Sequence, residues 1–373
     1  MRISKDIMKQ LSQAYLKIRN TARYMLGNLC DFNPDTDQTP LDRMEALDRF
    51  ALASFNDLVK TVREAYVRYE FHAVYRAVYN FCVVDMSNFY LDIIKDRLYC
   101  GDAHGRRSAQ TALYTILDGM TRLIAPILAF TSDEIWAAMR HDRSADTESV
   151  LLNDMPGYDE ALALSEADQV RWDKLISVRD AVNKALENAR AAGVFKKAQD
   201  TEVTLSVAEQ KDADFLSGVD LATLCIVSRV TVTTGAVEGE KMADCLIPCT
   251  IVVKLSEAPK CVRCWNHNEH VGEDHDHPEL CPRCAGVVRR RSISRQAQAP
   301  RPYVVWPRGL FVLPLPRRPV RAGLVLGALF DPGVLAVPAV HLVVSLAPLP
   351  VVLGKVFAGP ADFFFHGAHL LAL

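Results

Sequence analysis

The stretch from Lys260 to Cys284 reads KCVRCWNHNEHVGEDHDHPELCPRC and holds four cysteines in two pairs. Each pair, Cys261 with Cys264 and Cys281 with Cys284, has a two-residue gap, and sixteen residues separate the pairs. A two-residue gap lets both thiolates of a tight turn face one ion, so two such turns complete a tetrahedral four-thiolate site. The spacing therefore predicts one structural zinc ion, since four protein ligands leave no position for a reactive water.

Two alternatives to this site are open at the level of sequence. The four cysteines can form disulfides or stay free, but the other six are scattered and the chain shows no secretory signature, which favours a reducing cytoplasm. A histidine of the intervening loop can also replace a cysteine as ligand. Because four cysteines are already well placed, we expect the loop histidines to face solvent: His267, His270, His275 and His277.

The chain has 373 residues, half of them hydrophobic, which is enough for two or three domains with a sizeable core. Its formal net charge of -2 hides an asymmetry. From Arg289 onward nine Arg and one Lys oppose two Asp, a net of +8, so residues 1–288 carry -10. A basic stripe on an acidic body can still bind nucleic acid, so net charge excludes no class of partner. The opening MRISKDIMKQLSQAY has no apolar run long enough for a signal peptide.

The first 138 residues follow a helical period. Apolar side chains recur at three- and four-residue spacing from Ile7 to Met25, and similar patterns predict four long helices, at residues 3–27, 41–69, 70–98 and 107–139. Pro126 lies inside the last of them and should kink or break it. Long helices with short connections predict an antiparallel bundle.

A different pattern begins near residue 165. One more helix is expected at 165–192, with Gly193 as its C-terminal stop, followed by β-rich runs at 202–207, 225–233 and 250–255. A short helix at 208–216 should connect the first two runs. The predicted fold class is mainly α: an antiparallel helix bundle over 1–140, a linker over 141–164, a small α+β domain over 165–257 and the four-cysteine zinc module over 258–288.

The composition changes again at residue 289. Eleven of the 19 prolines follow it, no Glu occurs after Glu279, and neither helical nor strand period remains. We expect residues 289–373 to be disordered, or to be G+C-rich DNA read out of frame. The 23 residues from Pro332 to Gly354 carry no formal charge and are long enough for a membrane span, but four prolines argue against a clean helix. We expect no membrane association, with this stretch as the one exception to test.

Three stretches carry a resemblance to one family: ISKDIMKQLSQAYLKIRNTARYMLGNLCDF (3–32), RRSAQTALYTILDGMTRLIAPILAFTSDEIW (106–136) and the KCVRCW…HPELCPRC module. They resemble bacterial isoleucyl-tRNA synthetase, a class I aminoacyl-tRNA synthetase. The first two are partly shared with valyl- and leucyl-tRNA synthetases, and the zinc module singles out the isoleucyl enzyme. The resemblance covers residues 1–288 and implies the C-terminal portion of a cytoplasmic, monomeric ligase of protein biosynthesis, with residues 1–140 as its anticodon-binding domain.

In that family, ATP activates isoleucine, which is then transferred to tRNA(Ile). The family's HIGH-type signature and KMSKS-type loop are missing from this sequence, as are a P-loop and a G-x-G-x-x-G nucleotide-binding turn. We therefore assign no catalytic residue and expect the chain alone not to aminoacylate. FKKAQDTE (195–202) and the tail after Arg289 also depart from the family pattern. The alternative is a stand-alone zinc module, derived from a synthetase, that binds RNA or protein.

Contact with tRNA is expected at two places. The first helix carries basic residues whose plainer interpretation is a solvated helix face: Lys9, Lys17, Arg19 and Arg23. At the zinc module, Lys260 and Arg263 flank Trp265, whose ring either packs over the turn or offers a stacking surface to an unpaired base. Four tyrosines at helical spacing are expected in the core or at its edge: Tyr66, Tyr69, Tyr75 and Tyr79.

The six remaining cysteines are assigned no metal. Those in or beside the helices are expected to be small buried apolar residues: Cys30, Cys82 and Cys100. Those of the α+β domain follow no standard metal-binding spacing: Cys225, Cys245 and Cys249.

Overall fold

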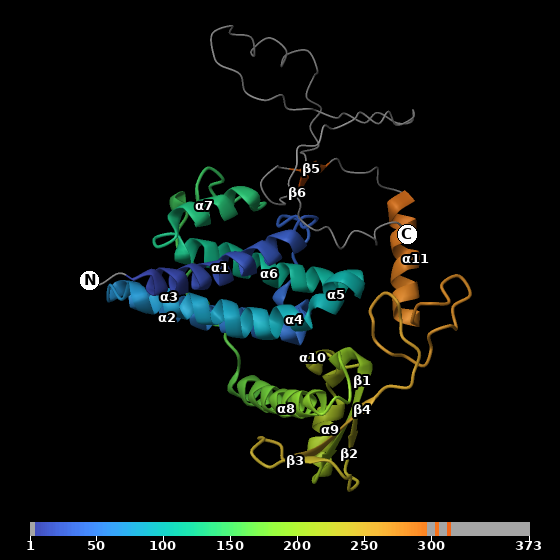
Figure 1. Cartoon of the computed structure of the whole chain (residues 1–373). Coiled ribbons are helices and arrows are strands. Elements are labelled where there is room, and N and C mark those ends of the chain that lie inside the picture. Colours follow the sequence, from blue (N-terminus) through green and yellow to red (C-terminus); the bar gives the residue numbers. More distant parts are fainter. Residues whose placement is uncertain (1–3, 297–302, 306–311, 315–373) are drawn as a thin grey trace, which may run out of the picture. The chain divides into compact units, whose positions relative to one another are not determined.

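The computed structural model describes residues 4–296, 303–305 and 312–314 (Figure 1). Its N-terminal part is a bundle of helices packed around one core that includes Met25, Val62, Val78 and Leu113. The predicted mainly helical fold of this part is confirmed. The helices are α1 Lys5–Asn28, α2 Ala46–Val67, α3 Phe71–Asn80, α4 Leu91–Ile93, α5 Lys95–Cys100, α6 Ala103–Ile124 and α7 Ala129–Ala138.

The helix predicted over 70–98 is interrupted in the structure. After α3 the turns widen into a π-helical segment, Phe81–Tyr90, and a break at Ile94 separates α4 from α5. The Ser87 hydroxyl donates to the Cys82 carbonyl oxygen at 2.7 Å, and the Thr21 hydroxyl of α1 approaches the same oxygen at 3.5 Å. Side chains that engage a backbone carbonyl in this way disturb the regular helical ladder, and hydrophobic spacing does not report them.

The break predicted at Pro126, inside the helix expected over 107–139, is confirmed, whereas one predicted helix start differs. α6 ends at Ile124 and α7 begins at Ala129, which confirms the interruption at Pro126. The helix predicted over 41–69 instead begins with a separate 3-10 turn, Leu41–Arg43, before α2.

Gly119 lets α6 approach α2 closely, because a Cβ at this position would lie 2.5 Å from the Cζ atom of Phe55.

Asp48, in the first turn of α2, is fully buried and fixes the position of α5. Its carboxylate accepts hydrogen bonds from Tyr90 Oη at 2.7 Å, from Ser108 Oγ at 2.5 Å and from the Arg97 guanidinium at 2.5 and 3.0 Å. A buried carboxylate is tolerated when it is paired and hydrogen-bonded in this way. Because Arg97 belongs to α5, the network ties α5 to α2.

Asp31 forms a second acidic network, which joins the loop after α1 to α6. It accepts hydrogen bonds from Arg106 at 2.6 and 2.9 Å and from Gln110 Nε2 at 2.8 Å. Burial alone would raise the pKa of this carboxyl, but the donors, led by Arg106, outweigh burial and lower the pKa of Asp31 to about 2.

The α+β part is a four-stranded sheet with helices packed on it. The strand order is β2-β1-β4-β3, with β1 parallel to β2 and β4 antiparallel to both β1 and β3. Burial alternates along β1, so Val203, Leu205 and Val207 join the core beneath α8. The elements are α8 Glu166–Ala191, β1 Thr201–Val207, α9 Gln210–Ser217, α10 Leu221–Cys225, β2 Arg229–Thr233, β3 Glu240–Met242 and β4 Cys249–Leu255.

Most of this second pattern was predicted, but α10 and β3 were not, and β2 starts later than expected. Gly193 follows α8 with a φ of +77°, which confirms it as a left-handed helix stop. The run predicted over 225–233 starts later, because Cys225 ends α10 and β2 begins at Arg229. β3 was not predicted, since its three residues carry no β-rich pattern. Short 3-10 turns occupy Val150–Leu152, Glu160–Leu162 and Ala198–Asp200.

The α+β part packs against the bundle through α8. The Trp172 ring of α8 stacks on Phe50 of α2 with centroids 4.5 Å apart. The buried Arg179 guanidinium donates to the Leu224 carbonyl oxygen at 3.0 Å and to the Asn88 carbonyl oxygen, in the π-helical segment, at 3.2 Å. Side chains of α8 therefore form a packed interface between the α+β part and the bundle.

The last helix, α11 Pro282–Gln296, begins at the second cysteine pair and runs through the boundary predicted at residue 289. Beyond it, β5 Tyr303–Val305 and β6 Val312–Pro314 pair antiparallel. The prediction for the rest of the tail, including 332–354, lies outside the described residues. Among the residues that are described, no helix combines the length and apolar character needed to cross a membrane.

Candidate metal centre and nucleic-acid interface

The four paired cysteines come together in one buried cluster. The sulfurs of Cys261, Cys264, Cys281 and Cys284 all lie within 4.8 Å of one another, and all four side chains are buried. The Cys264 and Cys281 sulfurs are 3.9 Å apart. A tetrahedron with Zn–S bonds of about 2.3 Å has an S···S edge of about 3.8 Å. The donor set and its spacing therefore fit a four-thiolate zinc site.

Backbone geometry holds each pair in a tight turn. The Trp265 N–H donates to the Cys261 carbonyl oxygen at 2.9 Å, and Trp265 itself has a φ of +67°. The second pair lies at the start of α11, where the Ala285 N–H donates to the Cys281 carbonyl oxygen at 3.0 Å. The Cys281 N–H donates to the Cys261 sulfur at 3.3 Å, which links the two turns. The two-residue gaps thus produce the turns that their spacing predicts.

The loop histidines differ from their predicted exposure. His270 and His275 are exposed as expected, whereas His267 and His277 are half-buried. The His267 Nδ1 lies 2.6 Å from the Ala258 carbonyl oxygen, and its backbone N–H donates to Ser228 Oγ at 2.7 Å. The expectation of a solvent-facing His267 is therefore wrong, because its ring also lies against the α+β part, with Nε2 3.4 Å from Asp200 Oδ1.

The cysteine cluster lies against α5, which it contacts in the first turn and at the C-terminal end. Arg283 forms a two-pronged ion pair with Asp96, with Nη2 2.8 Å from Oδ1. Arg263 donates to the Tyr99 carbonyl oxygen at 2.8 Å, and the Cys100 sulfur lies 3.8 Å from the Arg263 carbonyl oxygen. Since Asp48 fixes α5 through Arg97, these contacts connect the cluster to the bundle core.

Cys100 is a fifth thiol beside the four. It is buried, as predicted, and it packs in the same cluster as the paired cysteines. The sequence carries no signal for this neighbour, because Cys100 and the module are joined only by tertiary contact.

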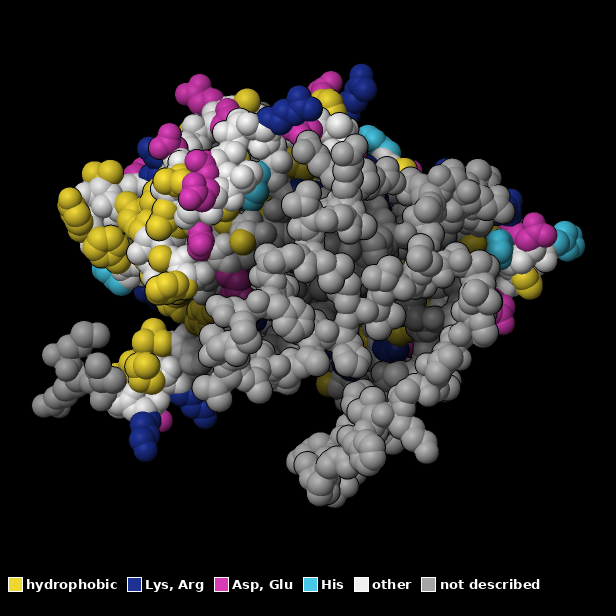
Figure 2. All heavy atoms as spheres, turned by 90° about the horizontal axis from the view of Figure 1, so that it is seen from above, with side chains coloured by type: hydrophobic (Ala, Val, Ile, Leu, Met, Phe, Trp, Pro, Cys, Tyr) yellow, Lys and Arg dark blue, Asp and Glu magenta, His cyan; other side chains and the backbone are white. Residues whose placement is uncertain are grey.

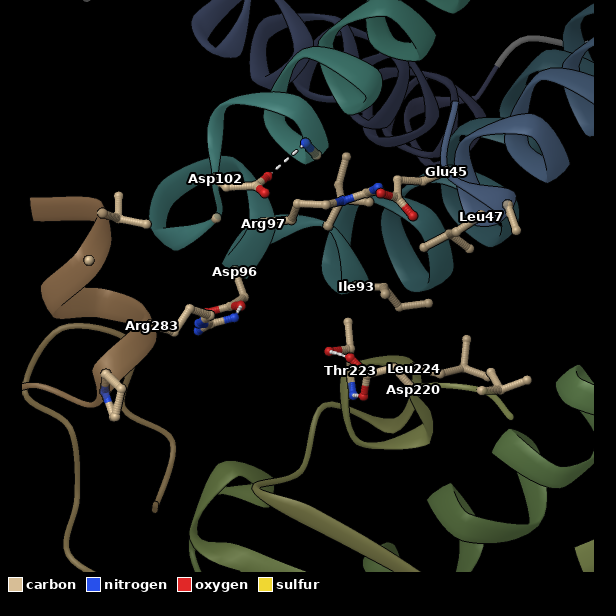
Figure 3. A pocket seen from close by; sticks show the side chains of 18 of the residues that line it. Glu45, Leu47, Ile93, Asp96, Arg97, Asp102, Asp220, Thr223, Leu224 and Arg283 are labelled. Carbon is tan, nitrogen blue, oxygen red and sulfur yellow. Dashed lines mark hydrogen bonds and ion pairs between the residues drawn. The ribbon is translucent and has the colours of Figure 1, made fainter. Parts of the chain in front are cut away.

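A hollow of about 520 Å³ lies where the bundle, α10 and α11 meet (Figure 3). In Figure 3 Asp96 and Arg283 point toward one another across it, and Asp102 accepts the N-terminal Gly105 N–H of α6 at 2.8 Å. The charge balance of the lining does not favour phosphate, since it has four carboxylates and three guanidinium groups: Glu45, Asp96, Asp102, Asp220, Arg97, Arg283 and Arg290.

Two of the three module residues predicted to contact tRNA are engaged within the protein. Lys260 pairs with Asp200 and lowers the pKa of that carboxyl, and Arg263 reaches the end of α5. Trp265 remains 51% exposed. Its indole N–H donates to the Val262 carbonyl oxygen at 3.1 Å, and Lys197 Nζ lies 4.4 Å from the ring centroid. The ring is therefore anchored at its edge and half-open to solvent.

The basic residues of α1 lie away from its buried side. Lys9, Lys17 and Arg23 are exposed, whereas Arg19 is half-buried with Nη2 3.8 Å from the Glu134 carboxylate. The buried residues of α1 follow one stripe: Ile18, Thr21, Ala22, Met25 and Asn28. On a helix of 3.6 residues per turn, Lys9 and Arg23 fall opposite this stripe and Lys17 at its margin.

Apolar side chains are also exposed on the bundle. On α1 they are Ile7, Met8, Leu11 and Leu16, and Figure 2 shows hydrophobic side chains gathered at the left-hand end of the described surface. Of the four tyrosines expected in or near the core, Tyr66, Tyr75 and Tyr79 pack against it, but Tyr69 is 79% exposed with a φ of +58°. The expectation for Tyr69 is wrong, because it lies in the turn after α2.

Comparison with known proteins finds two families along the chain. "Anticodon-binding domain of tRNA ligase" matches residues 48–205, and "Zinc finger found in FPG and IleRS" matches residues 259–286. The isoleucine–tRNA ligase of Syntrophotalea carbinolica is 45% identical over 300 residues, covering 78% of this chain and 31% of that protein. That of Desulforamulus reducens is 44% identical over 298 residues (77% and 31%), and that of Caldanaerobacter subterraneus 41% over 299 (78% and 32%).

These matches agree with the geometry. The first runs from α2 of the bundle to β1 of the sheet, and the second encloses all four clustered cysteines. The chain spans about a third of the length of the relatives it matches. It therefore belongs to the isoleucine–tRNA ligase family, of which it represents a C-terminal portion with the anticodon-binding domain and the zinc finger.

Proposed function

We propose that this chain binds the anticodon stem-loop of tRNA(Ile) for an isoleucine–tRNA ligase. The observation that carries the proposal is the co-occurrence of the anticodon-binding domain over 48–205 with the zinc finger over 259–286. Unpaired anticodon bases are read by stacking and by hydrogen bonds to their edges, and the flanking stem presents phosphates. The proposal thus needs one surface for phosphates and another for bases.

The phosphate surface in this proposal is the exposed side of α1. Lys9, Lys17 and Arg23 project from one side of the helix, and no ion pair among the described residues engages them. Exposed cations of this kind release counterions when they meet phosphates, which makes binding depend on salt. Arg19 contributes less, because Glu134 already accompanies it.

The base-contacting surface is Trp265, held by the zinc module. We assign one structural zinc ion to Cys261, Cys264, Cys281 and Cys284, where it closes the module and offers no position to water. Lys260 and Arg263 then act by position, because Asp200 and the end of α5 hold them and orient the turn that carries Trp265. The half-exposed ring is suited to stack on one base.

The activity of the whole relatives, ligation of isoleucine to tRNA with ATP, is proposed for a longer protein that includes this chain. The sequence holds no HIGH-type signature, KMSKS-type loop or P-loop, so we expect the chain alone to bind tRNA without charging it. We further propose a monomeric, cytoplasmic protein. ATP–pyrophosphate exchange by the purified, zinc-loaded chain would contradict the expectation that the chain alone does not activate isoleucine.

Fluorescence anisotropy with labelled tRNA(Ile) tests the binding proposal. The zinc-loaded chain should bind this tRNA at least tenfold more tightly than the same tRNA with an exchanged anticodon. A triple variant, Lys9→Gln with Lys17→Gln and Arg23→Gln, should bind with a weaker dependence on salt. The slope of the logarithm of the binding constant against the logarithm of the salt concentration should become shallower by about 0.7–0.9 for each lost phosphate contact. The matched control removes three exposed lysines of the α+β part and should leave the slope unchanged: Lys211→Gln, Lys241→Gln and Lys254→Gln.

Two results would count against the proposal. Equal affinity for both tRNAs would show binding without anticodon reading, as expected of a general RNA-binding module. Equal slopes for the two triple variants would remove α1 as the phosphate surface.

A further inference from the structure

A pair of cysteines lies outside the zinc module, at the edge of the sheet. Cys249 opens β4 and is buried, and its partner in the ladder is Met242 of β3. Cys245 lies in the loop between these strands and is half-buried. The Cys245 side of this loop lines a hollow of about 460 Å³ beside α8. Both thiols are free, and neither belongs to the four-sulfur cluster.

Hydrogen-bond donors converge on the Cys245 sulfur. The Ser177 hydroxyl of α8 lies 3.4 Å from it, and this hydroxyl is oriented by the Leu246 N–H, which donates to its oxygen at 2.9 Å. The Cys249 thiol and the Ile247 backbone N–H also donate to the Cys245 sulfur. Donors arranged in this way stabilise a thiolate over a thiol.

The charge state follows from this arrangement. The hydrogen bond from Cys249, ahead of the contrary effect of burial, lowers the pKa of Cys245 to about 6, and the same bond raises the pKa of Cys249. Asp180 opposes the thiolate. The other charged groups that line the hollow are Asp173, Lys184, Lys241 and Asp244. Cys245, which lines the hollow, is thus the sulfur of the pair that ionises first, while Cys249 keeps its proton.

We propose that Cys245 and Cys249 form an oxidation site that reacts with hydroperoxides and closes to a disulfide. The Cys245 thiolate attacks one oxygen of hydrogen peroxide, the O–O bond breaks, and the leaving hydroxide takes a proton to become water. The Cys249 sulfur then attacks the resulting sulfenic acid, a S–S bond forms, and a second water leaves with the Cys249 proton. Two thiols lose two electrons, and one peroxide becomes two waters.

The contacts suit this step. Cys245 lies outside the strand ladder and only four residues before Cys249, so its side chain can turn toward Cys249 without breaking a ladder bond. Cys225, in the same core, is the contrasting case, because burial raises its pKa to about 12. Cys30, which was expected to be buried, is exposed, and no hydrogen bond joins it to a second cysteine among the described residues.

Peptide mass spectrometry of the zinc-loaded chain tests the proposal. Trypsin cleaves after Lys241 and Lys254, and the peptide between these sites contains no cysteine besides Cys245 and Cys249. After mild treatment with hydrogen peroxide, this peptide should lack two hydrogens, and dithiothreitol should restore them. Zinc content, followed with a chromogenic chelator, should stay unchanged over the same interval.

Variants separate the two roles. Cys249→Ser should stop the reaction at the sulfenic acid, so that dimedone labels Cys245, whereas Cys245→Ser should give no label at Cys249. Cys30→Ser is the control and should oxidise like the unaltered chain. The proposal is overturned if the unaltered peptide stays reduced while zinc is released, or if Cys245 pairs with a cysteine other than Cys249. The first of these results needs no variant to fold.

Discussion

Replacing Asp48 by Asn tests whether one buried carboxylate holds α5 in place. Asp48 is fully buried and accepts hydrogen bonds from Tyr90, Ser108 and Arg97. Asn has the same size, but it offers a single neutral oxygen, and its amide N–H groups face a guanidinium that has only donors. The Arg97 side chain, 19% exposed, then remains mostly buried without a counter-charge.

The magnitude follows from the burial. Breaking a buried ion pair from one side costs about 3–5 kcal/mol, and we expect the lower end, about 3 kcal/mol, because the amide oxygen of the introduced Asn can still accept from one hydroxyl. For a domain of this size, about 2–4 °C of melting temperature are lost per kcal/mol, which predicts a fall of about 6–12 °C. The matched control is Asp92→Asn, since Asp92 and Lys95 form a pair 2.7 Å apart whose side chains are 42% and 54% exposed.

Thermal unfolding followed by far-UV circular dichroism, with zinc in excess, measures both variants. The exposed pair should contribute no more than about 1 kcal/mol, so Asp92→Asn should hardly move the transition. The buried variant should also speed amide exchange in α5, because Arg97 is the link between α5 and α2. If Asp48→Asn and Asp92→Asn shift the midpoint equally, burial of the Asp48 network is not what stabilises this end of the bundle.

Three further predictions concern acid stability, packing and the metal. Asp31 has a folded pKa of about 2 against an ordinary value of 3.8, so its contribution to stability is complete above about pH 4 and is lost as the pH falls toward 2. The urea midpoint of Asp31→Asn should therefore lie below that of the unaltered chain above pH 4, and the difference between the two midpoints should shrink as the pH falls toward 2. Gly119→Ala should destabilise the bundle by about 1–3 kcal/mol in urea unfolding, whereas Gly27→Ala, whose Cβ meets nothing within 4 Å, should be neutral or stabilise α1 slightly. Removing zinc with a chelator should speed amide exchange at 261–285 and at the end of α5 while α2 stays protected, and unchanged exchange in α5 would contradict the docking of the module on it.

Hydrophobic spacing predicted most of the bundle because packing on one core imposes the helical period directly. The same rule missed the π-helical segment, whose wider turns bury Met86 and Tyr90 but leave the apolar Val84 58% exposed, so its buried positions do not keep the α-helical period. Proline and glycine were more reliable at element ends: Pro126 ends a helix by its geometry alone, and Gly193 supplies a positive φ.

Cysteine spacing predicted the cluster because each pair is a local turn, whose geometry a few residues determine. The docking of that cluster is a long-range matter. Cys100 and Arg263 are 163 positions apart, and neither residue's sequence neighbours indicate the other. Cysteine spacing therefore predicts the four clustered cysteines, but it predicts neither Cys100 beside them nor the ion pair between Arg283 and Asp96.

The charged residues of the zinc module show why counting Lys and Arg in the sequence overestimates how many of them can contact phosphate. Lys260 and Arg263 are both basic in sequence, but Asp200 and the Tyr99 carbonyl already hold them, so their removal should disturb the position of Trp265 more than the attraction of phosphate. The phosphate contacts then belong to α1 and the base contact to Trp265, and the two kinds of contact depend differently on salt.

Salt titration of two variants separates these contacts. Trp265→Ala should weaken tRNA binding by about 1–3 kcal/mol at every salt concentration, because stacking on a base releases no counterions. Val262→Ala, which removes another exposed apolar side chain from the same turn, should leave affinity and zinc content unchanged. The α1 triple variant should instead change the slope. A Trp265→Ala chain that keeps its zinc and its affinity would show that the ring serves to cover the turn, and the stacking role would have to be abandoned.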